Sequence, residues 1–152
     1  MGLLELSTWI RAPVGRCFDL ARSIEAHCES ARSTAERVVE PGRLSGLLGL
    51  GDRVTFEARH LGLRRRLTAE IVEFEPPHRF VDVMVRGPFR SLRHEHRFAA
   101  HADGTRMHDV LRWELPCGVA GRVADRLVVT PHLRRFLSVR AEHLKRHAEA
   151  GR

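Results

Sequence analysis

The most constraining feature of this chain is a pair of alternating segments that leads directly into a long helical pattern. In residues 91–100 and 105–115, apolar and polar side chains alternate with a period of two, which is typical of half-buried strands. Asp103-Gly104 lies between them, and such a pair is favoured in two-residue hairpin turns. Beyond Pro116, apolar residues recur at helical spacing to about residue 148. The pattern predicts an antiparallel hairpin followed by one long C-terminal helix.

A turn at Asp103-Gly104 would fix the register of this hairpin. It pairs position 98 with 109, 96 with 111 and 94 with 113, and both apolar sets then lie on one face of the sheet. That face carries apolar side chains together with three polar ones, namely Leu92, Phe98, Met107, Leu111 and Trp113 with His94, His96 and Asp109. A polar group on an apolar face is costly unless it has a partner. These three residues are therefore the most informative about function.

The remainder of the chain alternates in the same way. Strands are predicted at 3–10, 35–40, 52–60, from about 66 to Pro76-Pro77, and at 80–86. Pro13 suits the first position of a short helix whose buried face carries Val14, Cys17, Phe18 and Ala21, and a second short helix is predicted at 24–32. Within that second helix, His27 has no visible partner. The glycine-rich stretch 44–51 is interpreted either as a loop packed on the core or as an apolar flap over a cavity mouth.

The C-terminal helix is expected to bury one apolar stripe, formed by Val119, Val123, Leu127, Leu133, Phe136, Leu137 and Leu144. Thr130-Pro131 interrupts it with the chemistry of an N-cap followed by the first helical position. We therefore expect a kink there or two abutting helices. Phe136 is predicted to be a buried member of the stripe.

Composition narrows the function classes. With 152 residues and 43% hydrophobic content, the chain is expected to form one domain over residues 1–152. The net charge of +7 comes almost entirely from dispersed arginines, Arg64-Arg65-Arg66 being their one run, so a nucleic-acid interface is not favoured. Three cysteines without metal-ligand spacing, no basic leader and no long apolar run indicate a cytoplasmic protein without a membrane span.

The order of elements (strand, two short helices, six strands, long helix) resembles the helix-grip fold of the START and polyketide cyclase/dehydrase superfamily. Short stretches also resemble a bacterial subgroup called cyclase/dehydrase-like or coenzyme-Q-binding-like: residues 50–54 (LGDRV), 74–77 (FEPP), 86–89 (RGPF) and 94–98 (HEHRF). The resemblance implies an α+β fold in which a curved antiparallel sheet of six or seven strands wraps around the C-terminal helix. It also implies an apolar cavity for a lipid, quinone or polyketide-like ligand. Family members include carriers, enzymes and regulators, so the fold alone does not choose among these functions.

On this interpretation the ligand-binding residues are expected on the concave face and the helix: Phe56, His60, His94, His96, Phe98, Asp109, Leu111, Trp113, Phe136 and Arg140. His96 and Asp109, diagonal to each other across the hairpin, form either a structural hydrogen bond, a ligand-orienting pair or an acid–base pair. Asp82 joins them only if its face of strand 80–86 points inward, which the pattern leaves open. No metal site is predicted, because His94-x-His96 lacks a visible third ligand, and no cofactor is predicted.

Three functions follow. The preferred one is sequestration of a hydrophobic small molecule, with apolar walls and a few polar groups that orient it. The second is a cyclase or dehydratase in which His96 and Asp109 transfer protons. Cyclase-like members use arginine or tyrosine in the pocket, and this chain has no tyrosine. The third is a regulator that binds a protein or RNA through its arginine-rich surface. Substitution of His96 by alanine would abolish turnover but spare binding only in the second case.

Overall fold

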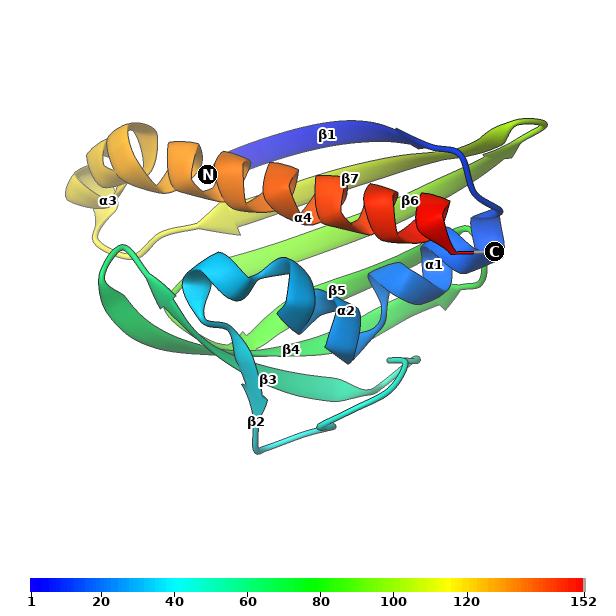
Figure 1. Cartoon of the computed structure of the whole chain (residues 1–152). Coiled ribbons are helices and arrows are strands. Elements are labelled where there is room, and N and C mark those ends of the chain that lie inside the picture. The colour runs from blue at the N-terminus through cyan, green and yellow to red at the C-terminus, as the bar shows by residue number, and fades with distance from the viewer. Residues whose placement is uncertain (152) are drawn as a thin grey trace.

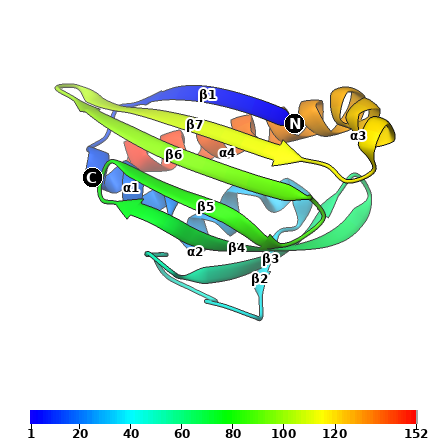
Figure 2. The same ribbon diagram turned by 180° about the vertical axis from the view of Figure 1, so that it is seen from behind.

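A computed structural model describes residues 1–151, and in it a curved sheet of seven antiparallel strands wraps around one long helix (Figures 1 and 2). The strand order is β1-β7-β6-β5-β4-β3-β2. The strands are β1 (Gly2–Ile10), β2 (Arg37–Val39), β3 (Arg53–His60), β4 (Leu63–Glu75), β5 (Arg79–Arg86), β6 (Ser91–His101) and β7 (Gly104–Glu114). The helical elements are α1 (Val14–Ala21), α2 (Ile24–Ser30), the 3-10 turn η1 (Arg32–Thr34), α3 (Gly118–Ala124), the π-helical turn η2 (Asp125–Val129) and α4 (Thr130–Ala150). The predicted helix-grip architecture is confirmed.

An aromatic cluster centred on Phe18 closes one end of the space between sheet and helix. Phe18 is 1% exposed, and its ring centroid lies 5.4–5.6 Å from those of Phe74, Phe80 and Phe98. Phe18 lies on the predicted buried face of α1. The buried residues of this face belong to the same core cluster as Ala148 of α4. This end of the molecule is solid core, and any hollow must therefore lie elsewhere along α4.

The register predicted for the last hairpin is wrong by two residues. His101 pairs with Gly104, so the turn residues are Ala102 and Asp103. A Cβ at Gly104 would clash with the carbonyl oxygen of Ile10, which explains why glycine stands where β7 begins beside β1 and not in the turn. Because a shift of two preserves the faces of both strands, the predicted apolar face is retained. His96 now lies directly opposite Asp109.

The C-terminal helical segment is continuous but changes its winding at η2. Proline lacks the N–H that an α-helix would use here, and its ring crowds the preceding turn. The wider π turn η2, which precedes Thr130-Pro131, accommodates both the missing N–H and the proline ring. Thr130 is itself helical and its hydroxyl donates to Asp125 Oδ1, so the predicted N-cap is wrong. The predicted kink or break is resolved as this local change of winding.

The first half of the predicted apolar stripe is not buried. The side chains of Val119, Val123 and Leu127 are 66%, 54% and 70% exposed, because α3 and η2 lie beyond the end of β7 and not over the face of the sheet (Figure 1). In α4 the stripe is buried as predicted at Leu137 and Leu144, joined by Ala141 and Ala148. Phe136 is only partly buried. No helix within residues 1–151 combines the length and the apolar character needed to cross a membrane.

Candidate ligand cavity and its polar clusters

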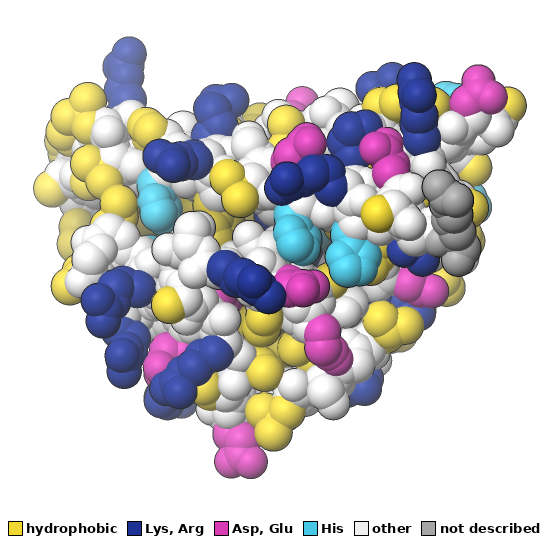
Figure 3. Space-filling model, in the orientation of Figure 1, with side chains coloured by type: hydrophobic (Ala, Val, Ile, Leu, Met, Phe, Trp, Pro, Cys, Tyr) yellow, Lys and Arg dark blue, Asp and Glu magenta, His cyan; other side chains and the backbone are white. Residues whose placement is uncertain are grey.

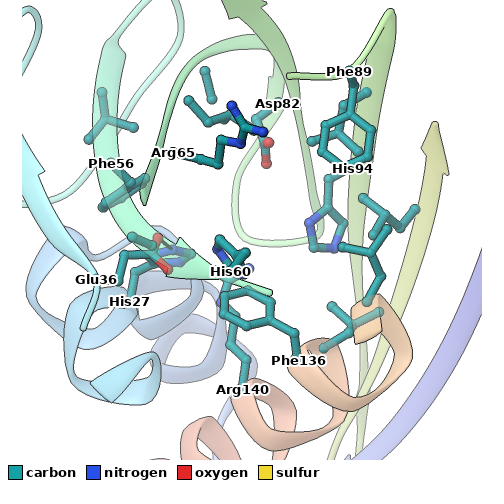
Figure 4. Close-up of a pocket in the computed structure, with 18 of the residues that line it drawn as sticks. His27, Glu36, Phe56, His60, Arg65, Asp82, Phe89, His94, Phe136 and Arg140 are labelled. Atoms are coloured by element: carbon teal, nitrogen blue, oxygen red, sulfur yellow. Dashed lines mark hydrogen bonds and ion pairs between the residues drawn. The ribbon is translucent and has the colours of Figure 1, made fainter. Parts of the chain in front are cut away.

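A cavity of about 390 Å³ lies between the concave face of the sheet and the first half of α4 (Figure 4). Its walls are mainly apolar and come from β3, β4, β6, β7 and α4, with further contributions from β5, α2 and the loops. The apolar lining residues include Val54, Phe56, Ala58, Leu67, Ala69, Ile71, Leu92, Leu111, Leu133, Phe136 and Leu137. The alternation predicted from the sequence explains this lining, since the lining residues of β3 and β4 are every second residue of 54–60 and 63–71.

Seven of the ten residues predicted to bind a ligand line this cavity: Phe56, His60, His94, His96, Leu111, Phe136 and Arg140. The other three lie elsewhere. Phe98 belongs to the aromatic core around Phe18. Trp113 is buried in a satellite cluster and donates from Nε1 to Asp125. Asp109 lies against His94 and His96, which separate it from the cavity.

The first polar group of the cavity, here called the sheet cluster, consists of Asp82, His94, His96 and Asp109. Asp109 Oδ1 lies 2.9 Å from His94 Nε2 and 3.1 Å from His96 Nδ1. His96 Nε2 lies 2.9 Å from Asp82 Oδ2. Asp82 faces the cavity, which resolves the orientation left open by the sequence. The two imidazole rings are stacked with centroids 3.7 Å apart.

This geometry gives the two histidines different protonation. Burial alone would lower the pKa of His96, but hydrogen bonds to Asp109 and Asp82 outweigh it and raise that pKa. Burial, together with the positive charge of His96, lowers the pKa of His94 despite its bond to Asp109. His96 is therefore the cationic member of the stack, with both nitrogens donating to carboxylates. His94 is neutral, donates from Nε2 to Asp109, and keeps the lone pair of Nδ1.

This assignment changes the roles expected of the pair. His96 is 2% exposed and both of its nitrogens are engaged, so it has no free position for proton exchange with a ligand. His94 Nδ1 has no hydrogen-bond partner within the described residues, and His94 lines the cavity. The sheet cluster thus presents a neutral base oriented by a buried carboxylate, an arrangement suited to proton transfer.

Asp82, His94 and His96 are also close enough to share a metal ion, since one ligand atom of each lies within 4.8 Å of the others. However, an imidazole binds metal along the plane of its ring. Two rings stacked 3.7 Å apart with 29° between their planes do not direct their lone pairs to one point about 2 Å from each nitrogen. The stacking therefore favours a hydrogen-bonded cluster over metal coordination.

A second polar group, here called the helix cluster, lies at the α2 side of the cavity and consists of His27, Glu36, His60, His132 and Arg140. Figure 4 labels all of them except His132. His27 Nε2 donates to Glu36 Oε1, and the His27 ring stacks on Phe56 with centroids 4.2 Å apart. His60 Nδ1 lies 2.9 Å from His132 Nε2, which joins β3 to α4. Arg140 Nη2 donates to the carbonyl oxygen of Ala21.

Most of the helix cluster was missed by sequence reasoning. Glu36 follows Ala35, whose left-handed backbone (φ 52°) turns the chain, and no sequence pattern indicates that an alanine adopts this conformation. His27 and His132 lie on helices at positions without an apolar signal. Arg65 also lines the cavity, whereas Arg66, its neighbour in the arginine run, pairs with Glu57.

The charges of the helix cluster favour an ionised Glu36. Burial alone would raise the pKa of this carboxyl, but the charge and hydrogen bond of His27, with further contributions from His60 and Arg140, lower it. Burial lowers the pKa of His60. At neutral pH the cavity therefore contains an ionised carboxylate in a largely apolar wall.

Comparison with known proteins identifies the family to which this chain belongs. A family profile described as "Polyketide cyclase / dehydrase and lipid transport" matches residues 1–149. The chain belongs to this family. None of the curated proteins matches it in sequence.

Solved structures resemble this polyketide cyclase/dehydrase family member in fold. The ZhuI aromatase/cyclase of a Streptomyces species superposes with a TM-score of 0.78 at 12% identity, over 97% of this chain and 93% of that one. A protein of Thermus thermophilus gives 0.72 at 21% identity, over 94% and 97%. A major latex-like protein of Panax ginseng gives 0.70 at 14% identity, over 97% of each chain. At these identities the likeness concerns the fold alone.

Proposed function

We propose that this protein binds a hydrophobic small molecule in the cavity between the sheet and α4. The observation that carries the proposal is the cavity itself, about 390 Å³ in volume and lined mostly by apolar side chains. Small-molecule sites in proteins typically have about 300–1,000 Å³ and a few polar groups in an apolar lining. A family described by both cyclase/dehydrase activity and lipid transport is consistent with an apolar ligand.

Binding of a neutral fluorescent probe, N-phenyl-1-naphthylamine, tests the proposal. Ala69 is buried and lines the cavity, so Ala69→Phe places a ring inside it. Ala99 is exposed on β6, so Ala99→Phe adds the same ring outside and is the matched control. We expect saturable binding at one site per chain in the wild type and the control, and at least tenfold weaker binding in Ala69→Phe.

Salt provides an independent arm of the same experiment. On the face that carries α4, the basic side chains are scattered among acidic and apolar ones (Figure 3). A cavity ligand without charge is held almost independently of ionic strength, whereas contacts to an arginine-rich surface weaken steeply with added salt. The absence of saturable binding, or equal binding by the filled variant, would overturn the proposal. Strong loss of binding between 50 and 500 mM salt would favour the surface-interaction alternative.

The sheet cluster supports a second function, proton transfer on a bound ligand. This second function rests on the neutral His94, which lines the cavity and has a free Nδ1 while its Nε2 is hydrogen-bonded to Asp109. A base in this position would remove a proton next to a carbonyl group, as in a cyclisation or dehydration of a polyketide-like chain. In this role His94 replaces His96, the residue favoured from the sequence.

Deuterium exchange into phenylacetone, followed by proton NMR in D₂O, tests this second function. We expect the wild type to accelerate exchange of the protons next to the carbonyl. His94→Gln should lose the acceleration while retaining N-phenyl-1-naphthylamine. His101→Gln, a change at an exposed histidine of β6, is the control. Exchange at the uncatalysed rate in a wild type that binds phenylacetone would exclude His94 as a base for such ketones.

A further inference from the structure

The helix cluster contains a buried hydrogen-bond acceptor without a donor. Glu36 Oε1 accepts from His27, but Oε2 is buried and has no hydrogen-bond partner within residues 1–151. The Glu36 side chain is only 5% exposed. Buried polar atoms in proteins are nearly always paired, and an unpaired one calls for an explanation.

The surroundings of Glu36 hold its carboxylate in place. Its partner His27 is held by this hydrogen bond and by stacking on the ring of Phe56. Both Glu36 and His27 line the cavity, next to Phe56 and His60 in Figure 4. The free oxygen therefore belongs to a fixed group on the cavity wall, and its position does not depend on a flexible surface side chain.

The hydrogen bonds made by neighbouring side chains go to other partners. His27 donates through Nε2 to the other carboxylate oxygen, His60 bonds to His132 through Nδ1, and Arg140 donates to Ala21. An ionised carboxylate accepts hydrogen bonds but cannot donate them, and the nearby positive charges lower the pKa of Glu36. No described residue donates to Oε2, and Glu36 lines the cavity, so a group bound in the cavity can supply the missing donor.

We propose that Glu36 Oε2 is the acceptor for a hydroxyl group at one end of an otherwise apolar ligand, an alcohol or a phenol. This inference rests on the proposed function and narrows its ligand class. A carboxylate at that end of the ligand would meet the negative charge of Glu36. An ether or a hydrocarbon would leave Oε2 without a donor, and the apolar remainder of the wall suits the body of the ligand.

A matched pair of ligands isolates the hydroxyl group. 2-Naphthol and 2-methoxynaphthalene share one ring system, but only the former donates a hydrogen bond. We expect the wild type to bind 2-naphthol at least tenfold more tightly, measured by displacement of N-phenyl-1-naphthylamine. Glu5→Gln, a change at an exposed residue of β1, should retain this preference.

Glu36→Gln should remove or reverse the preference. His27 donates to Oε1, so the glutamine oxygen takes that position and its NH₂ group faces the cavity. The site then offers a donor in place of an acceptor, and the methyl ether should bind at least as well as the naphthol. A naphthol preference that persists in Glu36→Gln would overturn the inference.

The outcomes separate this inference from the function on which it rests. If the wild type binds neither compound nor the probe, the proposed function fails. If it binds both compounds equally, the hydroxyl acceptor fails while the apolar cavity site stands. A readout that needs no variant is the hydroxyl proton of bound 2-naphthol, which should give a downfield, slowly exchanging NMR resonance. Tight binding without such a resonance would also count against Glu36.

Discussion

Replacement of Asp109 by asparagine tests the arrangement of charge in the sheet cluster. Asp109 is 4% exposed and accepts from His94 and His96 at 2.9 and 3.1 Å. Asparagine keeps the shape and one acceptor oxygen, but it removes the negative charge beside the cationic His96. The expected consequences are a less stable protein and a lower pKa of His96.

The magnitude follows from these two contacts. The bond from neutral His94 changes from charge-assisted to neutral, which costs roughly 1 kcal/mol, and the His96 cation loses one of its two buried counter-ions. Breaking a buried pair by removing one partner typically costs about 3–5 kcal/mol. Because Asp82 remains as a second counter-ion for His96, we expect the lower end, about 3 kcal/mol of unfolding free energy.

The cost should depend on pH in a defined direction. The pKa of His96 is raised by folding, so the stabilisation from its charged form is complete below its unfolded value near about 6.5 and is lost as pH rises through the folded value. The pKa of Asp109 is lowered by folding, so its contribution is lost only as pH falls well below about 4. The destabilisation in Asp109→Asn should therefore be largest at about pH 5–6.5 and smaller at about pH 9.5.

Urea denaturation followed by circular dichroism measures this cost across the pH range, and an NMR titration gives the pKa of His96. Asp103→Asn, at an exposed residue of the β6–β7 turn, is the matched control and should cost less than about 0.5 kcal/mol. Equal destabilisation at pH 6 and pH 9.5, or a cost no greater than that of the control, would refute the charge assignment.

Three further changes test the division between core, cavity wall and exposed helix, each by chemical denaturation. Phe18→Ala should cost about 3–5 kcal/mol, because it removes a fully buried ring that contacts three other rings; a cost below about 1 kcal/mol would contradict this core. Phe136→Ala should cost only about 1–2 kcal/mol, because the ring is partly buried on the cavity wall, and should also weaken probe binding. The unfolding free energy of Leu127→Ser should stay within about 0.5 kcal/mol of the wild type, since Leu127 is 70% exposed; a larger loss would mean that the Leu127 side chain is packed against the rest of the protein.

The sequence predicts the faces of the strands well, because alternation depends only on which side of the sheet is buried. The alternation therefore correctly places His60, His94 and His96 on the face that lines the cavity. It does not predict the register of the last hairpin, which depends on the contact between Gly104 and Ile10 across two strands distant in the chain.

Helical periodicity identifies an apolar stripe but not what covers it, which explains the wrong expectation for Val119, Val123 and Leu127. Glu36 could not be found from the sequence, because its place on the cavity wall depends on the backbone of Ala35 and on its pairing with His27. Contacts of this kind appear only once the elements are packed together.

Helix α4 is divided along its length. Its second half holds the fold together through Ala141, Leu144 and Ala148, whereas His132 and Phe136, in the first half, face the cavity. Most substitutions on the cavity side should consequently change ligand preference with little effect on folding. A single helix of this design allows evolution, or an engineer, to exchange one recognition surface for another while the same scaffold is retained.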